Sequence, residues 1–144
     1  MKENIFAKYF SEKNGIYPCL TLIVLICFFI FKDFILFSNV YLYKDVASDS
    51  INASYAHFLN VSEYIRSQGF PKWSFHNGLG QNIFSLILRD PSDLLVYFLK
   101  SDSIPYVIIF KELFKIIASG LVFYLFLRKL SLTVYTSVVG AMLY

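Results

Sequence analysis

Residues 16–37 read IYPCLTLIVLICFFIFKDFILF, and this stretch decides the fold. It carries no charged residue before Lys32 and Asp33, which lie near its end. A helix rises about 1.5 Å per residue, so roughly 20 residues cross the apolar core of a bilayer. We therefore expect a transmembrane helix over residues 16–37, with both charged side chains close enough to one end to reach the interface.

A cleaved signal peptide is the alternative, because Lys2, Lys8 and Lys13 precede the apolar block. The block ends in bulky aromatic residues without a small-residue cleavage site, which favours an uncleaved anchor. Cys19 and Cys27 lie inside it, too far apart along one helix to form a disulfide. We interpret both cysteines as packing residues.

The composition also favours a membrane protein. Of the 144 residues, 57% are hydrophobic and 16% are charged, whereas about a quarter of the residues in soluble domains are charged. The apolar residues come in long blocks, which excludes a disordered chain and argues against a soluble globular domain. The net charge of +3 is spread along the chain, so no basic stripe indicates a nucleic-acid partner.

Residues 38–103 are mixed in polarity, and we expect a long extracytoplasmic loop with amphipathic helices. Spacings of three and four define one face of the first helix, formed by Ile51, Tyr55, Phe58, Ser62 and Ile65. Asp49 or Ser50 can cap its start, and Gly69 with Pro71 ends it.

Further along this loop, Asn77-Gly78 and Gly80 are turn signals. A second short helix can begin with Asp90 as its cap and Pro91 in its first turn. Both helices have apolar faces that can lie on the membrane surface or against neighbouring spans.

A second transmembrane helix is expected over residues 104–127. It must include Lys111, Glu112 and Lys115, which fall within about 100° of one helix face. Each charge costs roughly 2.5–3.5 kcal/mol at the centre of a spanning helix, and less near its ends. This stripe therefore predicts a protein-lined or watery cavity rather than contact with lipid.

Residues 128–144 are expected to form a short cytoplasmic turn and the start of a truncated third transmembrane helix. Arg128 and Lys129 precede an apolar stretch too short to cross a bilayer. The chain is then the N-terminal part of a larger multi-spanning protein, and the alternative is a small protein with a re-entrant tail. Basic residues concentrate on the inside, so residues 1–15 are expected in the cytoplasm. The expected fold class is all-α and multi-pass.

Asp45 and Asp49 are the first candidates for chemistry, four positions apart at the outer end of the first span. A carboxylate there can act as general base toward a sugar hydroxyl. Two carboxylates can instead hold a divalent cation together with phosphate oxygens. The alternative is structural, with Asp49 as a helix cap and Asp45 as a solvated loop residue.

Other polar residues allow two interpretations each. Lys111 and Lys115 can neutralise the phosphate of a lipid carrier, or Lys111 can pair locally with Glu112. Trp73 and the tyrosines can stack on sugar rings or lie in an interfacial aromatic belt. His57 and His76 show no metal-ligand spacing, and Gly78-Leu79-Gly80 lacks the third glycine of a dinucleotide fingerprint.

Five segments in order carry a resemblance to a known family. They are KDVASDSINASYAHF (44–58), FPKWSFHNGLGQNIF (70–84), RDPSDLL (89–95), KIIASGLVFYLFLRKL (115–130) and VVGAMLY (138–144). Together they resemble the N-terminal part of the YfhO-type bacterial membrane proteins, within the glycosyltransferase-C superfamily. The resemblance covers most of residues 43–144.

The resemblance implies transfer of a sugar from a polyprenyl-phosphate carrier to a cell-envelope polymer, such as a teichoic acid, outside the membrane. The acidic loop residue of the family precedes an aromatic pair and a proline. Asp49 matches it best, with Tyr55 as the matching aromatic residue. Ser54 and Ala56 stand where an aromatic and a proline are usual, so Asp45 stays a competing candidate.

Two other functions fit the same sequence. In a non-enzymatic transport or assembly subunit, the charged stripe of the second span would line a substrate pathway, and both aspartates would be expendable. In a bare membrane anchor with an interaction role, none of these polar residues would matter beyond folding.

Overall fold

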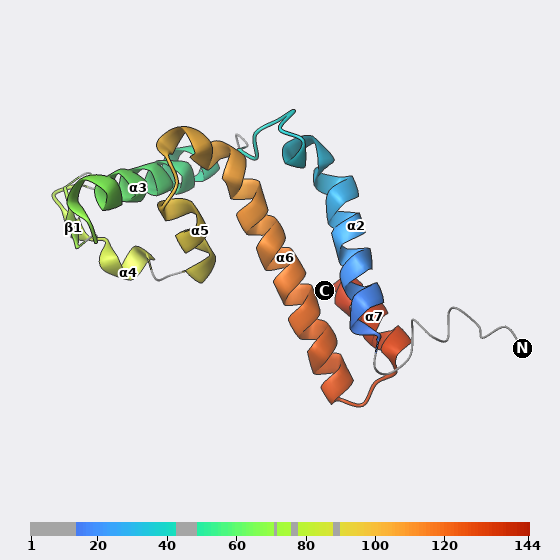
Figure 1. The fold of residues 1–144 in the computed structure, drawn as a ribbon. Helices are drawn as coiled ribbons and strands as arrows, with labels where there is room; N and C mark the ends of the chain where they lie inside the picture. Colours follow the sequence, from blue (N-terminus) through green and yellow to red (C-terminus); the bar gives the residue numbers. More distant parts are fainter. Residues whose placement is uncertain (1–13, 43–48, 71, 76–77, 88–89) are drawn as a thin grey trace, which may run out of the picture. The chain divides into compact units, whose positions relative to one another are not determined.

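The computed structural model describes residues 14–42, 49–70, 72–75, 78–87 and 90–144, most of them helical (Figure 1). The elements in chain order are α2 (Ile16–Ile35), η1 (Ser50–Tyr55), α3 (Ala56–Gln68), β1 (Trp73–Ser74), β2 (Gln81–Asn82), α4 (Phe84–Ile87), η2 (Pro91–Asp93), α5 (Leu94–Tyr97), η3 (Ser101–Ser103), α6 (Ile104–Lys129) and α7 (Val134–Leu143). The chain divides into a terminal unit, Met1–Lys32 with Leu113–Tyr144, and a central unit, Asp33–Glu112.

α2 confirms the first expected helix and ends at Ile35. Its buried residues are Cys19, Ile23 and Cys27, which form one narrow stripe at a spacing of four. Both cysteines are buried free thiols, which confirms them as packing residues. Most other large apolar side chains of α2 are exposed. By length and composition, α2 is the one helix among the described residues that qualifies as a membrane span.

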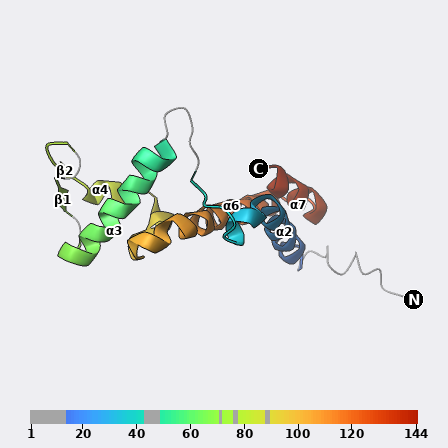
Figure 2. The ribbon, with the colours of Figure 1, turned by 90° about the horizontal axis from the view of Figure 1, so that it is seen from above.

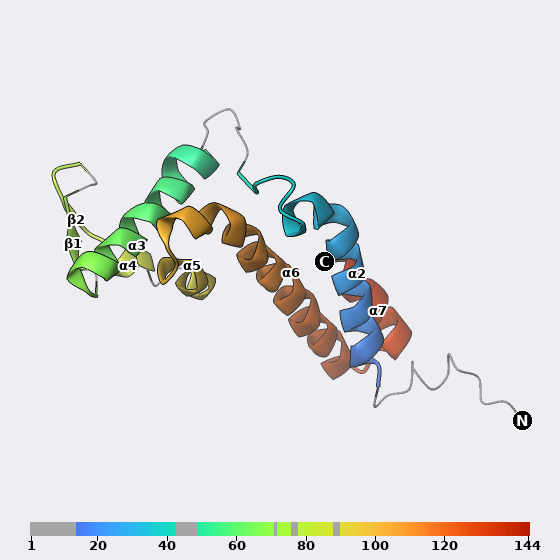
Figure 3. The same ribbon diagram turned by 45° about the horizontal axis from the view of Figure 1, so that its top comes forward.

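Glycines set the packing of the terminal unit, where α2 lies beside α7 (Figures 1 and 3). A Cβ atom at Gly120 of α6 would lie 2.8 Å from Cδ1 of Ile23 in α2. One at Gly140 of α7 would lie 2.5 Å from Cδ1 of Leu127 in α6. Small residues therefore permit these close contacts, as they do between membrane helices. Thr133 caps α7 by accepting a hydrogen bond from a backbone N–H of the first turn.

The central unit has its own apolar core, in which α3 packs against α5. The buried core residues are Phe58, Val61, Ile87, Val96, Tyr97, Ile104 and Ile108. Ser62 is also fully buried, because its hydroxyl donates a 2.6 Å hydrogen bond to the carbonyl of Leu99. Burial of a hydroxyl is tolerated when it is hydrogen-bonded in this way.

A small antiparallel hairpin corrects the all-α expectation (Figure 2). Trp73 pairs with Asn82, and Ser74 pairs with Gln81. The turn signals at Gly78 and Gly80 hold, since both glycines have positive φ. The sequence gives no strand signal because each strand is two residues long, too short for an alternating pattern.

The residues expected to start and end the loop helices are partly confirmed. Gly69 ends α3 with φ 81, in agreement with the expected stop. Asp90 caps η2 by accepting a hydrogen bond from the backbone N–H of Ser92. The expected cap at Asp49 is wrong, because its side chain makes no capping hydrogen bond. Ile51 is 37% exposed, so it lies outside the buried face of this helix.

α6 is one continuous helix that contains the whole of residues 104–127. Its first half bears Lys111 and Glu112, and Lys115 follows one turn later. Crossing of the membrane by α6 and α7 stays a prediction, since neither helix qualifies as a span by length and composition.

Candidate functional site

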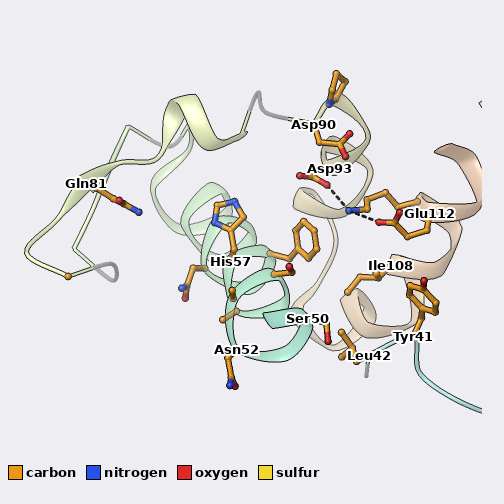
Figure 4. A pocket seen from close by; sticks show the side chains of 18 residues that line it. Tyr41, Leu42, Ser50, Asn52, His57, Gln81, Asp90, Asp93, Ile108 and Glu112 are labelled. Atoms are coloured by element: carbon orange, nitrogen blue, oxygen red, sulfur yellow. Dashed lines mark hydrogen bonds and ion pairs between the residues drawn. The ribbon is translucent and has the colours of Figure 1, made fainter. Parts of the chain in front are cut away.

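The central unit contains a cavity of about 1240 Å³ (Figure 4). Its walls come from η1, α3, β2, η2 and the first half of α6, together with Tyr41 and Leu42. Uncharged polar side chains on these walls are Ser50, Asn52, Ser54, Asn60 and Gln81. The titratable residues are His57, Asp90, Asp93, Lys111 and Glu112. The cavity thus offers many hydrogen-bond donors and acceptors.

Lys111 is buried in the wall between two carboxylates, as the dashed lines of Figure 4 show. Its Nζ lies 2.8 Å from Oδ1 of Asp93 and 3.1 Å from Oε1 of Glu112. The same Nζ lies 4.7 Å from the ring centroid of Phe58. Burial of an ammonium requires such partners. The expected local pair with Glu112 is therefore present, and Asp93 adds a second partner.

A hydrogen-bonded chain continues from Asp93 to a histidine. The hydroxyl of Tyr97 donates to Oδ2 of Asp93 over 3.4 Å, and His57 Nε2 lies 3.2 Å from that hydroxyl. Because the single hydroxyl proton of Tyr97 points to Asp93, His57 donates its Nε2 proton to Tyr97. The protonation of His57 is thereby linked to the carboxylate of Asp93.

Burial shifts the pKa values of His57 and Tyr97 in this hydrogen-bonded chain. Burial lowers the pKa of His57 below its ordinary value of 6.5, and the nearby Asp93 carboxylate opposes this shift. Burial, reinforced by the charge of Asp93 and its hydrogen bond, raises the pKa of Tyr97 well above its usual range. Near neutral pH His57 is therefore uncharged, and Tyr97 remains a proton donor. Among the described residues, Asp90, Asp93 and Glu112 share the cavity wall with Lys111.

The residues expected to carry chemistry lie on different elements of the chain. Lys111 lines the cavity, and Asp49 directly precedes the cavity residue Ser50. Tyr55 packs against the apolar core, and Trp73 lies on the hairpin. Lys115 belongs to the terminal unit, and Asp45 lies outside the described residues.

Sequence reasoning missed Asp93, Glu112 and His57 as members of one site. A signal existed in RDPSDLL, because Asp93 follows the Asp90 cap by three residues and so lies one turn further along. The sequence predicts Glu112 as part of a charged stripe lining a cavity and as a local partner of Lys111, and the structure places both residues on the cavity wall. Among the described residues, no three His, Cys, Asp or Glu side chains form a group that could hold a metal ion.

Comparison with known proteins identifies a family that the chain matches. The sequence model of the family described as "Bacterial membrane protein YfhO" matches residues 18–144. No curated protein and no solved structure matches the chain.

Proposed function

The chain belongs to the YfhO family of bacterial membrane proteins, and from this premise we propose that it is part of a membrane glycosyltransferase. In this proposal a sugar moves from a polyprenyl-phosphate carrier to a cell-envelope polymer at the outer face. The observation that carries the proposal is the cavity of the central unit, with Lys111 held between two carboxylates.

The proposed reaction requires a base and a phosphate contact. An acceptor hydroxyl attacks the anomeric carbon of the sugar, the bond from that carbon to the phosphate oxygen breaks, and the hydroxyl proton passes to a carboxylate. The polyprenyl phosphate leaves as an anion. A positioned carboxylate accelerates such a step by about 10²–10⁴-fold, and a lysine ammonium stabilises the leaving phosphate.

In this proposal Lys111 releases one of its two carboxylate partners to contact that phosphate. The side chain of Glu112 is 28% exposed and that of Asp93 is 13% exposed, so Glu112 is the partner more easily released. Its carboxylate is the group proposed to accept the hydroxyl proton. Lys115 is proposed as the second phosphate contact, one helical turn along α6.

Two carboxylates compete for the role of base in this proposal. Asp49 is the candidate base that the family resemblance implies, and Asp45 competes with it for this role. The two aspartates could instead bind a divalent cation. Glu112 is the candidate that the cavity supports, since it lines the wall beside Lys111. Replacing each in turn distinguishes them.

The experiment measures sugar transfer in membranes that contain the complete gene product. Polyprenyl-phosphate [¹⁴C]glucose and polyprenyl-phosphate [¹⁴C]N-acetylglucosamine are supplied as donors, and label in the cell-envelope polymer is counted. We expect transfer by the wild type and its loss in Glu112→Gln or in Asp49→Asn. Asp102→Asn changes an exposed carboxylate outside the cavity and should keep full transfer.

The amount of each variant in the membrane is measured together with transfer, because Glu112 also pairs with Lys111. Loss of transfer in one of the two variants at an unchanged amount assigns the base, and retained transfer in both removes the carboxylate assignment. No transfer by the wild type, with transport lost in Lys115→Leu, would favour a transport or assembly subunit instead.

The proposal includes a topology, with a cytoplasmic N-terminus, a multi-pass chain and the central unit outside. A membrane-impermeant maleimide added to intact cells should label Ser103→Cys, which is exposed on η3. Labelling only after the cells are opened would contradict this topology.

A further inference from the structure

Five large apolar side chains are exposed on and around the β1–β2 hairpin. We call them the hairpin patch: Phe70, Trp73, Phe75, Leu79 and Phe84. Leu79 is 100% exposed and Phe75 is 77% exposed. A cluster of exposed apolar side chains on a folded protein marks a surface that binds another phase or molecule.

The local structure holds these rings in position without burying them. The rings of Phe70 and Phe84 lie 5.4 Å apart between centroids, and those of Trp73 and Phe75 lie 6.4 Å apart. Gly80 lies beneath the second pair, since a Cβ atom there would be 2.6 Å from Nε1 of Trp73. The patch is therefore formed before any partner binds.

A basic residue, Lys72, lies beside the patch. Lys72 lines a shallow hollow together with Phe70, Trp73 and Phe84. Residues 67–88 of the sequence contain one charged residue, Lys72. Anionic lipid headgroups attract a lysine that lies close to the membrane surface. Tryptophan and other aromatic residues beside a lysine are typical of the membrane–water interface.

We infer that the hairpin patch is a lipid-binding surface, which inserts into the headgroup region of an anionic bilayer leaflet. The aromatic rings enter the boundary between headgroups and acyl chains, and Lys72 contacts lipid phosphates. The chain belongs to a family of membrane proteins, and α2 is long and apolar enough to span a bilayer. A bilayer is therefore the partner that we assign to this surface. The inference is independent of the proposed sugar transfer.

Trp73 makes the inference directly measurable, because it is the one tryptophan in the sequence. The full chain is reconstituted into vesicles of phosphatidylcholine and phosphatidylglycerol, and its fluorescence is recorded with acyl chains brominated at shallow or deep positions. We expect blue-shifted emission that shallow bromines quench more than deep ones. Emission typical of water, without quenching, would overturn the inference.

Blue-shifted emission that no brominated lipid quenches would also overturn it. In that case protein covers the patch, either a second copy or another segment of the gene product.

Matched variants separate the patch from general contact with lipid. Phe75→Ser should reduce the quenching of Trp73, whereas Phe98→Ser, at a residue 70% exposed outside the patch, should leave it unchanged. Lys72→Gln should remove the dependence of quenching on the phosphatidylglycerol content. Equal effects of the two phenylalanine variants would contradict a specific role of the patch.

The Leu79→Asp variant tests whether a loss of quenching comes from misfolding. The side chain of Leu79 contributes nothing to the core, because it is fully exposed. This variant should therefore keep its helical circular dichroism and lose most of the shallow quenching. Unchanged quenching would overturn the inference.

Discussion

Lys111 of α6 donates a 2.8 Å hydrogen bond to Asp93 of η2, and this ion pair joins two segments 18 positions apart in the sequence. Glu112 contacts the same ammonium from the next position of α6. The contact closes one wall of the cavity, because both carboxylates and the lysine line it. The stability of the central unit and the proposed chemistry of its cavity therefore depend on the same residues.

Replacing Lys111 with methionine should destabilise the protein. The change leaves Asp93 and Glu112 without their buried cation, and loss of one partner from a buried ion pair costs about 3 kcal/mol. Denaturant unfolding in detergent micelles measures this loss. Lys100→Met removes an exposed lysine of the central unit and should change the free energy of unfolding by no more than about 0.5 kcal/mol.

A second variant tests whether the effect comes from the ion pair. Adding Asp93→Asn to Lys111→Met removes one of the two stranded charges, so it should restore part of the lost stability. Additive losses from the two substitutions would contradict a coupled pair.

Acidification should destabilise the protein through His57. Its pKa is lowered in the folded state, so the unfolded chain binds more protons as the pH falls below about 6.5. This contribution to stability is complete above that pH and declines below it. His57→Gln should therefore lose less stability than the wild type between pH 7.5 and pH 5.5, as measured by thermal unfolding.

His76→Gln provides the matched control, since His76 is the other of the two histidines. If the His76 variant weakens the pH dependence of stability and the His57 variant does not, the buried His57–Tyr97 contact is not the origin of that dependence.

Gly120→Ala should destabilise the terminal unit by about 1–3 kcal/mol, because the new Cβ would lie 2.8 Å from Cδ1 of Ile23. Ile23→Val removes exactly that carbon atom. The double variant should therefore be more stable than Gly120→Ala alone in detergent unfolding. A double variant less stable than either single one would argue against this contact between α2 and α6.

Gly80→Ala should displace the ring of Trp73, because φ is +102 and the new Cβ would lie 2.6 Å from its Nε1. The near-ultraviolet circular dichroism of the single tryptophan reports the change. Gly78→Ala is the matched control, since its φ is also positive but no described atom beyond its chain neighbours lies within 4 Å of the added carbon. It should strain the turn and leave the tryptophan signal unchanged.

The elements predicted correctly from the sequence depend on local chemistry. The apolar run of α2, the stop at Gly69 and the cap at Asp90 each arise within a few residues. Ile51 was misplaced because η1 is π-helical. A π-helical turn holds more residues than an α-helical turn, so spacings of three and four no longer mark one face there.

The site was harder to predict than the helices. Asp93 meets Lys111 only because η2, α5 and the start of α6 fold together in the central unit, and residue spacing alone does not reveal that contact. His57 was interpreted from its lack of metal-ligand spacing, whereas its partner is Tyr97, 40 positions away. The resemblance to the family was confirmed over residues 18–144.

Photoaffinity labelling tests most directly whether the cavity of the central unit receives the donor. Membranes with the complete gene product are irradiated with polyprenyl-phosphate glucose and polyprenyl-phosphate N-acetylglucosamine that carry a diazirine on the sugar, and labelled peptides are mapped by mass spectrometry. We expect label on the cavity-lining segments 50–60 and 90–93, reduced by unlabelled donor. Label confined to other segments, or insensitive to unlabelled donor, would contradict a donor site in this cavity.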